Sequence, residues 1–300
     1  MNTAVNVENV SKTFRATTGS VEAVKDVSFS IPRGEVVALL GENGAGKSTL
    51  IDMLLGLSVP SSGSVELMSE SPVEAVRHSL VSAMLQAGGL LKELTVKDQV
   101  AMVASTYKNS TGAQQVLTEA GITDIASQKI GKCSGGQQQK VKFAIALLGN
   151  PEILILDEPT TGMDVNARKT FWDSMHALAD AGKTIIFATH YLEEAEEFAD
   201  RIIMMAHGQV IADGTTTKIR TLNGLRKISF SLPGEQHLEL TPEQKQLWGI
   251  TNLISNGTEY SMRCASVENF LPYVLSSYEV SDLQIIRPTL AEAFSKLAHA

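Results

Sequence analysis

The chain has 300 residues, 43% of them hydrophobic, which is enough for one large and one small domain with apolar cores. Its formal net charge of -8 argues against general polyanion binding, so we expect no nucleic-acid partner. Its two cysteines cannot form a disulfide framework, which fits a reducing compartment. We expect no signal peptide, and no apolar run approaches the roughly 20 residues of a spanning helix.

The N-terminal part predicts strands followed by a glycine-rich loop. Apolar residues alternate along 5–10 and 27–31, which is typical of strands with one solvated face. The run VVALL at 36–40 predicts a buried parallel strand, and GENGAGKST follows it at 41–49. A helix with one apolar face is then predicted from the helical spacing of Leu50, Met53, Leu54 and Leu57.

Three further strand-like runs, at 80–85, 153–156 and 184–189, each end at a polar residue. Ligands of open parallel sheets bind beyond the carboxyl ends of the strands. The pattern therefore predicts a site at one sheet edge, formed by Gly41, Gln86, Asp157, Glu158 and His190.

The remaining segments predict helices and a small appendage. The pattern is helical over about 87–150, and EEAEEFAD at 193–200 is interpreted as a solvated helix face. From about 223 the runs alternate between strands and helices. We therefore predict a main domain over 1–222 and a small α+β domain over 223–300.

The first glycine-rich loop fits the pattern G-x-x-x-x-G-K-[ST] between a strand and an amphipathic helix. Glycines let backbone N–H groups approach phosphate oxygens, and the following helix presents its positive end. Lys47 is predicted to reach the β- and γ-phosphates, and Ser48 to ligate Mg²⁺. The residues assigned to the nucleotide here are Gly41, Glu42, Asn43, Gly44, Ala45, Gly46, Lys47, Ser48 and Thr49.

The run ILILDEP adds two acidic residues at the end of an apolar strand. This arrangement predicts that Asp157 holds Mg²⁺ and that the adjacent Glu158 polarises a water as general base. The alternative for Glu158 is a solvated carboxylate at a strand end.

A second glycine-rich stretch, CSGGQQQK, occupies 133–140. Ser134 and Gln137 fit a capping box, which predicts the start of a helix. Gly135 and Gly136 each disfavour that helix by up to about 1 kcal/mol, so we interpret them as exposing N–H groups to an anion. Because the helical insert separates this loop from the first one, we predict a head-to-tail dimer in which each chain offers its second loop to the other's ATP.

GENGAGKST, Gln86, CSGGQQQK, ILILDEP, TTGMD and His190, in this order, resemble the ATP-binding subunit of an ABC transporter over residues 1 to about 220. The resemblance implies an α/β P-loop NTPase core with an antiparallel β subdomain and a helical subdomain. It also implies that Phe14 stacks on adenine, that Gln86 contacts Mg²⁺ and the attacking water, and that His190 holds the γ-phosphate. The implied contacts across the dimer come from Ser134, Gly135, Gly136, Gln137 and Asp164.

Cys133 stands where the family usually has leucine, and Phe14 where tyrosine is more usual. The insert and the segment RPTLAEAFSKLA are similar to the subfamily that exports drugs, antibiotics or lipid-linked compounds. The resemblance then implies a cytoplasmic ATPase, peripheral to the membrane, with two partners. One is an integral membrane subunit, and the other is a second copy or a homologous ATPase chain.

Two other classes remain open. A soluble ABC-type ATPase could act as a nucleotide-dependent switch outside transport, although such proteins usually carry two cassettes or a long coiled coil. A P-loop kinase or GTPase would not need the SGGQ stretch or His190. The other histidines, among them His207, are interpreted as surface or packing residues.

Overall fold

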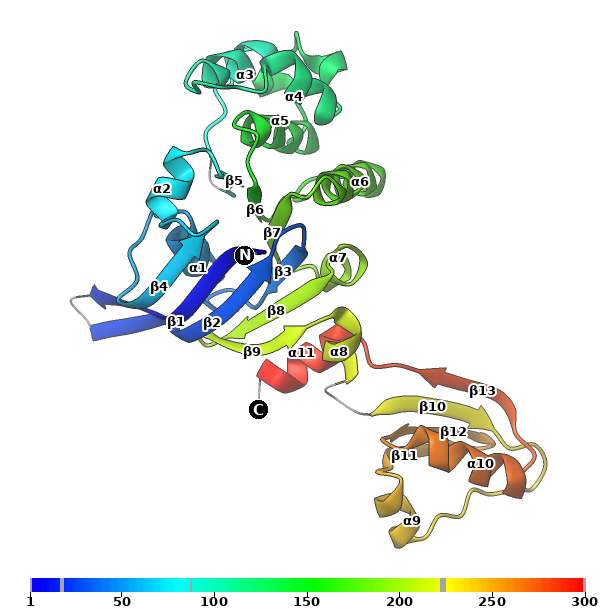
Figure 1. Cartoon of the computed structure of the whole chain (residues 1–300). Coiled ribbons are helices and arrows are strands. Elements are labelled where there is room, and N and C mark those ends of the chain that lie inside the picture. The colour runs from blue at the N-terminus through cyan, green and yellow to red at the C-terminus, as the bar shows by residue number, and fades with distance from the viewer. Residues whose placement is uncertain (1, 17–18, 87, 222–224, 299–300) are drawn as a thin grey trace. The chain divides into compact units, whose positions relative to one another are not determined.

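The computed structural model describes residues 2–16, 19–86, 88–221 and 225–298 (Figure 1). The chain divides into two compact units, Met1–Thr215 and Thr216–Ala300. The boundary predicted between residues 222 and 223 falls on residues outside those described.

The larger unit is built on a six-stranded sheet with the order β5-β6-β7-β3-β8-β9. Its strands are β3 (Val36–Leu40), β5 (Val81–Met84), β6 (Ile153–Asp157), β7 (Thr184–Thr189), β8 (Arg201–Ala206) and β9 (Gln209–Gly214). The first five strands in that order are parallel, and β9 runs antiparallel to β8. All side chains of β3 and β7 are buried, which explains why β3 is apolar throughout and why β7 is apolar between its two terminal threonines.

Helices cover both faces of this sheet (Figure 1). On one face, α1 (Lys47–Leu54) contributes Leu50 and Met53 to a core shared with the N-terminal strands. On the other face, Trp172 of α6 (Val165–Asp180) stacks on Phe198 of α7 (Leu192–Phe198) with 4.8 Å between the ring centroids. The sheet therefore lies between two apolar layers.

The N-terminal strands form a three-stranded antiparallel sheet with the order β2-β1-β4. These strands are β1 (Thr3–Ala16), β2 (Gly19–Pro32) and β4 (Ser62–Leu67), and α2 (Pro72–Arg77) follows them. The alternating apolar residues predicted to face the core are all buried, from Val5 to Ile31. The predicted apolar face of α1 is wrong at Leu57, which is exposed, because Gly56 turns to φ 69° and the helix has already ended.

The helical part of this unit lies within residues 87–150. It contains α3 (Val96–Ala104), α4 (Ala113–Glu119) and α5 (Gly135–Leu147), with the short turns η1 (Thr123–Ile125) and η2 (Ile130–Lys132) before α5. Buried apolar residues such as Val100, Val116 and Val141 line the three helices, which pack against one another. The segment thus forms a small bundle that carries the second glycine loop at the start of α5.

The C-terminal unit is α+β, as predicted. Its antiparallel sheet has the order β11-β12-β10-β13. The elements are α8 (Thr216–Thr221), β10 (Arg226–Ser231), α9 (Pro242–Leu247), β11 (Thr251–Asn256), β12 (Glu259–Cys264), α10 (Val267–Ser277), β13 (Ser281–Ile286) and α11 (Leu290–Ala298). One face of the sheet packs on α10 in a separate core that includes Phe230, Trp248 and Phe270.

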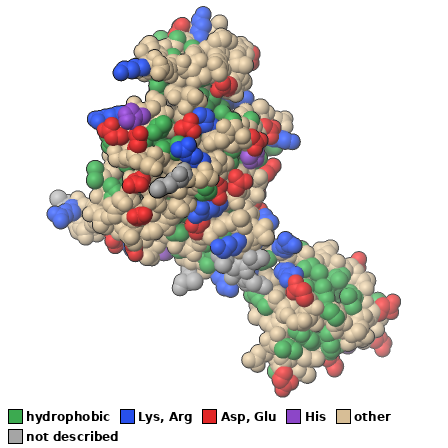
Figure 2. All heavy atoms as spheres, in the orientation of Figure 1, with side chains coloured by type: hydrophobic (Ala, Val, Ile, Leu, Met, Phe, Trp, Pro, Cys, Tyr) green, Lys and Arg blue, Asp and Glu red, His purple; other side chains and the backbone are tan. Residues whose placement is uncertain are grey.

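Apolar side chains also reach the surface of the C-terminal unit. Figure 2 shows them gathered on its visible face, and its exposed large hydrophobic residues include Leu275, Leu283 and Ile285. In the part of the chain that the structure describes, no helix is both long and apolar enough to cross a membrane.

Candidate active site

The strand register brings the predicted site residues to one edge of the six-stranded sheet. Leu40, the last residue of β3, lies opposite Thr189 at the end of β7. Asp157 at the end of β6 lies opposite Ala188, and Met84 at the end of β5 lies opposite Leu156. The residues that follow these strands therefore leave the sheet at the same edge, as the apolar runs predict, and the site that they would form stays a prediction.

The first glycine loop is held closely by the backbone around it. Gly46 has a φ of 104° and immediately precedes α1. Because it is a glycine, it has no side chain with which to cap the helix. A Cβ on Gly46 would lie 2.5 Å from the Ala23 carbonyl, and a Cβ on Gly41 would lie 2.5 Å from the Met205 carbonyl. Glycine is required at both positions, and the first N–H groups of α1 remain available to a phosphate.

The Lys47 ammonium closes this loop. It donates hydrogen bonds to the carbonyls of Gly41, at 2.7 Å, and Glu42, at 3.2 Å. Burial lowers the pKa of Lys47, and the nearby carboxylates of Glu158 and Asp157 partly oppose that shift. Lys47 is therefore a partly desolvated cation that lies near the carboxylates of Glu158 and Asp157.

A cavity of about 530 Å³ opens over the phosphate loop. Phe14 of β1 lines it together with Asn43, Gly44, Gly46, Lys47, Ser48 and Thr49. The Phe14 ring is half exposed, and Lys12 Nζ lies 5.2 Å from its centroid. The structure therefore brings the predicted adenine-stacking residue into the cavity of the predicted phosphate-binding residues.

Six lining residues were not assigned to the site from the sequence: Val21, Glu22, Ala23, Lys25, His207 and Gly208. Val21 and Lys25 come from β2, and His207 comes from the turn between β8 and β9. No local pattern marks them, because they reach the cavity only through the pairing of β1 with β2 and the position of β8 beside β3.

The surroundings of Asp157 disfavour its ionised form. Its pKa is raised because the carboxylate is desolvated and because Glu158 lies beside it, while Lys47 acts in the opposite direction. Adjacent desolvated carboxylates favour a bound cation, which would offset their charge. The site therefore fits a metal ion at Asp157.

Glu158 is held in an unusual backbone conformation next to His190. Its φ is 50°, a left-handed value that is uncommon for a residue with a side chain and that clusters at functional sites. Its Oε1 lies 2.7 Å from His190 Nδ1, and its Oε2 is buried without a hydrogen-bond partner among the described residues. One oxygen thus contacts the imidazole, and the other is a buried acceptor that has no hydrogen-bond partner among the described residues.

Gln86 is only partly brought to the site. Its side chain is exposed two residues beyond β5, and its carbonyl accepts a hydrogen bond from Lys142 Nζ at 3.0 Å. Within the described residues, the hydrogen bonds do not join its side chain to Ser48 or Asp157. The structure places Gln86 at the predicted edge without bringing it onto the predicted metal ligands.

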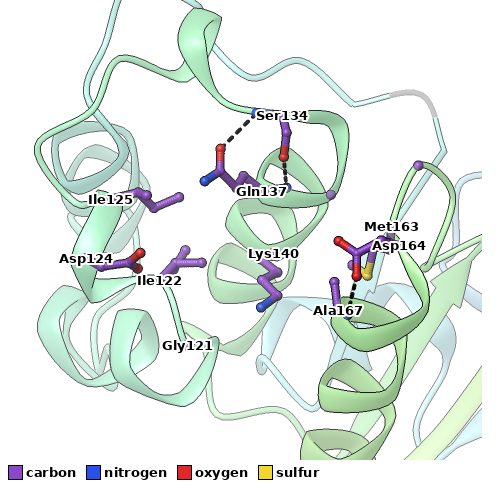
Figure 3. Close-up of a pocket in the computed structure, with 12 residues that line it drawn as sticks. Gly121, Ile122, Asp124, Ile125, Ser134, Gln137, Lys140, Met163, Asp164 and Ala167 are labelled. Carbon is purple, nitrogen blue, oxygen red and sulfur yellow. Dashed lines mark hydrogen bonds between the residues drawn. The ribbon is translucent and has the colours of Figure 1, made fainter.

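The second glycine loop begins α5 in the predicted way. Ser134 Oγ accepts from the N–H of Gln137, and the Ser134 N–H donates to Gln137 Oε1 at 2.9 Å (Figure 3). This reciprocal pair confirms the capping box. Cys133 is buried just before it, as expected for a residue in place of leucine, and burial raises the pKa of its thiol.

The two glycines of this loop have different surroundings. A Cβ on Gly136 would meet Met163 Cγ at 3.3 Å and the Gly162 carbonyl at 3.4 Å, so α5 packs closely on the loop before α6. Gly135 is exposed, and its Cβ would come no nearer than 3.8 Å to the Gly162 carbonyl. Close packing therefore explains the glycine at position 136, which the sequence interpretation missed. Packing does not explain the glycine at position 135.

A separate cavity of about 240 Å³ lies between α5 and the loop before α6 (Figure 3). Ser134, Gly136 and Gln137 line it from α5, and Asp164 lines it from the facing loop. Asp164 also caps α6, because its Oδ1 accepts from the N–H of Ala167 at 2.9 Å. This cavity and the one over the phosphate loop have no lining residue in common, so they are two separate cavities of one chain.

The interpretation of 193–200 as a solvated helix face is wrong at Glu194. Its side chain is only 2% exposed and accepts hydrogen bonds from Thr160 and Thr189. The acidic composition gave no sign of this burial, because one partner, Thr160, lies 34 residues away and the other, Thr189, is at the end of a buried strand.

Comparison with known proteins identifies this arrangement. Residues 24–161 match the family described as ABC transporter. The chain is 36% identical over 220 residues to Nod factor export ATP-binding protein I of Rhizobium sp. (strain N33), covering 71% of each chain. The chain belongs to the ABC transporter family. The protein of the same name from Burkholderia thailandensis is 36% identical to this ABC ATPase over 240 residues, or 76% of this chain and 79% of the other.

Solved structures agree with this assignment. A dimeric ATP-binding cassette in a post-hydrolysis state, bound to ADP and Pi, has a TM-score of 0.64 and 28% identity, covering 70% of this chain and 98% of the other. The ATP-binding subunit of an ABC transporter has a TM-score of 0.65 and 30% identity, covering 74% and 93%. The predicted P-loop NTPase fold is confirmed, and this ABC protein is an ATP-binding ATPase.

Proposed function

We propose that this ABC ATPase hydrolyses ATP to drive the export of a drug, antibiotic or lipid-linked compound through a separate membrane subunit. The geometry of Glu158 and His190 carries the catalytic part of the proposal, because one carboxylate oxygen contacts the imidazole and the other has no hydrogen-bond partner among the described residues. The export part is supported by relatives that are named as export ATP-binding proteins.

In this proposal the residues of the first loop bind ATP. The N–H groups at the start of α1 and the Lys47 ammonium surround the β- and γ-phosphates, and Phe14 stacks on the adenine. Lys47 would exchange its hydrogen bonds to the Gly41 and Glu42 carbonyls for bonds to phosphate oxygens. Its ammonium is already partly desolvated, which strengthens its attraction for an anion.

Mg²⁺ is the metal that this donor set fits. Ser48, Gln86 and Asp157 would hold it with oxygen ligands, and the raised pKa of Asp157 reflects an excess of negative charge that a cation would offset. Among the described residues, clusters of three or more histidine, cysteine or acidic side chains able to hold a metal are absent, so phosphate and water oxygens would complete the shell. When bound, the ion neutralises phosphate charge.

Glu158 acts as the general base. Its free Oε2 accepts the proton of the attacking water while Oε1 stays in contact with His190 Nδ1. His190 is half exposed, so its ring can both orient the carboxylate and contact the γ-phosphate. Gln86 is assigned to the water and the metal, although among the described residues its side chain makes no hydrogen bond to Ser48 or Asp157.

The second half-site acts on a second chain. Ser134, Gly135, Gly136 and Gln137 would present the start of α5 to the partner's γ-phosphate, and Asp164 would cross the interface. The cassette solved with ADP and Pi is itself a dimer, which supports this arrangement. The second chain is either another copy or a homologous ATPase.

The membrane subunit is proposed to dock near Gln86 and the helical segment. The ATPase is proposed to lie on the cytoplasmic face of the membrane. The test is reconstitution of the full chain in vesicles with the membrane protein encoded beside it. ATP-dependent substrate movement and faster ATP turnover are expected. If the chain neither associates with these vesicles nor changes its ATPase rate there, the result would favour the soluble nucleotide-dependent switch instead.

Two variants separate binding from hydrolysis in the same assay. Lys47→Ala should lose ATP affinity, because the lysine meets the phosphates directly. Glu158→Gln should keep its ATP affinity and lose about 100-fold or more in kcat, because the amide cannot accept the proton. Near-normal turnover by Glu158→Gln would contradict the general-base assignment, and Glu193→Gln, an exposed neighbour of the site, is the control.

A further inference from the structure

Glu194 is a buried carboxylate without a role in the assignments above. It lies in the first turn of α7, and its side chain is 2% exposed. A buried carboxylate is costly unless its oxygens are hydrogen-bonded or paired with a charge. The contacts of the Glu194 side chain therefore indicate its role in the structure.

Both carboxylate oxygens are engaged. Oε1 accepts a hydrogen bond from Thr160 Oγ1, and Oε2 accepts one from Thr189 Oγ1 at 3.0 Å. Arg168 Nε of α6 lies 3.3 Å from Oε1 as a charge contact that lacks hydrogen-bond geometry. One side chain thus joins residues that are separated by almost 30 positions in the sequence, Thr160 and Thr189.

The two threonines belong to the segments that carry the proposed catalytic pair. Thr160 follows Glu158 by two residues and opens the loop that leads to Asp164. Thr189 immediately precedes His190, and its Oγ1 also accepts a hydrogen bond from the Tyr191 N–H at 3.0 Å. The network therefore fixes the chain on both sides of His190 and holds it to the loop after Glu158.

A carboxylate suits this position better than a neutral amide. Thr189 Oγ1 already accepts from Tyr191, so its own proton is directed at Glu194. Thr160 likewise donates, so the central side chain must accept twice. A glutamine has one acceptor oxygen, and its NH₂ group would face a hydroxyl that needs an acceptor.

We infer that Glu194 is a positioning residue that ties the Glu158 segment to the His190 segment and so maintains the contact between Glu158 Oε1 and His190 Nδ1. This inference rests on the proposed roles of Glu158 and His190. Glu194 acts through Thr160 and Thr189, whose backbone positions it sets. Through the same loop it also connects the catalytic pair with Asp164, at the other half-site.

The first test compares the kinetics of Glu194→Gln with those of Glu193→Gln in the full-length chain. Glu194→Gln should lose about tenfold in kcat, because small displacements of catalytic groups are expensive, while KM for ATP changes less than about twofold. Glu193→Gln, which removes an exposed charge from the same turn, should leave both constants unchanged. Equal kcat for the two variants would overturn the inference.

The second test is a mutant cycle. Thr160→Val and Thr189→Val each remove one hydrogen bond to the carboxylate and keep the side-chain shape. If the three residues form one network, adding Thr160→Val to Glu194→Gln should lower kcat by less than about twofold more. Thr189→Val also removes the acceptor of the Tyr191 N–H, so its further loss should be larger. Independent, multiplicative losses would mean that Glu194 does not connect the two segments.

A third measurement does not depend on catalysis. In hydrogen–deuterium exchange, Glu194→Gln should speed exchange at 160–164 and at 189–191 together, relative to Glu193→Gln. Faster exchange confined to α7 would show a local packing role and overturn the inference. Normal turnover by Glu158→Gln would instead contradict the proposed function while leaving this exchange pattern as expected.

Discussion

The two glycine loops of this ABC ATPase begin helices in opposite ways. The phosphate loop reaches α1 through Gly46, at φ 104° and without a capping side chain, and surrounding carbonyls leave no room for a Cβ. The second loop reaches α5 through Ser134 with a complete capping box, and Gly135 and Gly136 have ordinary helical φ values. The first loop is shaped by its own chain, whereas the second is a regular helix start.

This difference shows how one chain divides the work of binding. The phosphate loop encloses an anion site by itself, with Lys47 and the cavity that Phe14 lines. The second loop leaves Gly135 open towards solvent, so a ligand from outside the chain can approach this helix start. A molecule with one self-contained and one open half-site is suited to a head-to-tail dimer around ATP.

The largest expected effect comes from adding one methyl group to the first loop. Gly46→Ala should destabilise the chain by about 2 kcal/mol or more and abolish ATP binding, because the left-handed φ and the Ala23 carbonyl both exclude a Cβ. Thermal unfolding and titration with a fluorescent ATP analogue measure the two losses. Gly44→Ala is the comparison, because its Cβ would meet open space although its φ of 86° still costs strain.

The same substitution should have opposite signs at the two positions of the second loop. Gly136→Ala should destabilise the chain by about 1 kcal/mol, because the new Cβ presses on Met163 and Gly162. Gly135→Ala should raise the stability by up to about 1 kcal/mol, because alanine favours the helix and the site is open. Equal thermal stability of the two variants would mean that the glycines are equivalent.

An effect of similar size is expected from the helix cap. Ser134→Ala should cost about 1 kcal/mol, or about 2–4 °C in Tm for a unit of this size, because the hydrogen bond to the Gln137 N–H is lost. Thr241→Ala is a matched control, since Thr241 forms the same capping box with Gln244 at the start of α9. Both should lose similar stability in their own units, but only Ser134→Ala should weaken ATP-dependent association.

Local patterns were enough to predict the sheet and its edge. The apolar runs of β3, β5, β6 and β7 are each complete within a few residues, and the polar residue after each strand marks the site. The cap at Ser134 could be predicted for the same reason, because its two partners are three residues apart. These features depend on neighbours in the sequence.

Features that depend on distant segments could not be predicted. Glu194 has acidic neighbours on a short helix, and only the folded chain shows that Thr160 and Thr189 surround its carboxylate. Gly136 likewise gains its packing role from Met163. The wrong prediction at Leu57 has a local cause instead, because α1 has already ended before the adjacent Gly56. The roles assigned to Gln86 and Asp164 stay predictions, since they depend on ATP and a second chain.

The most direct measurement of the central claim is the size of the Glu158→Gln chain in solution, by light scattering with and without Mg-ATP. The account predicts a monomer without nucleotide and a dimer with it, because the open loop of each chain needs the other chain's γ-phosphate. A dimer of equal stability without nucleotide, or a monomer at high protein concentration with saturating Mg-ATP, would contradict it.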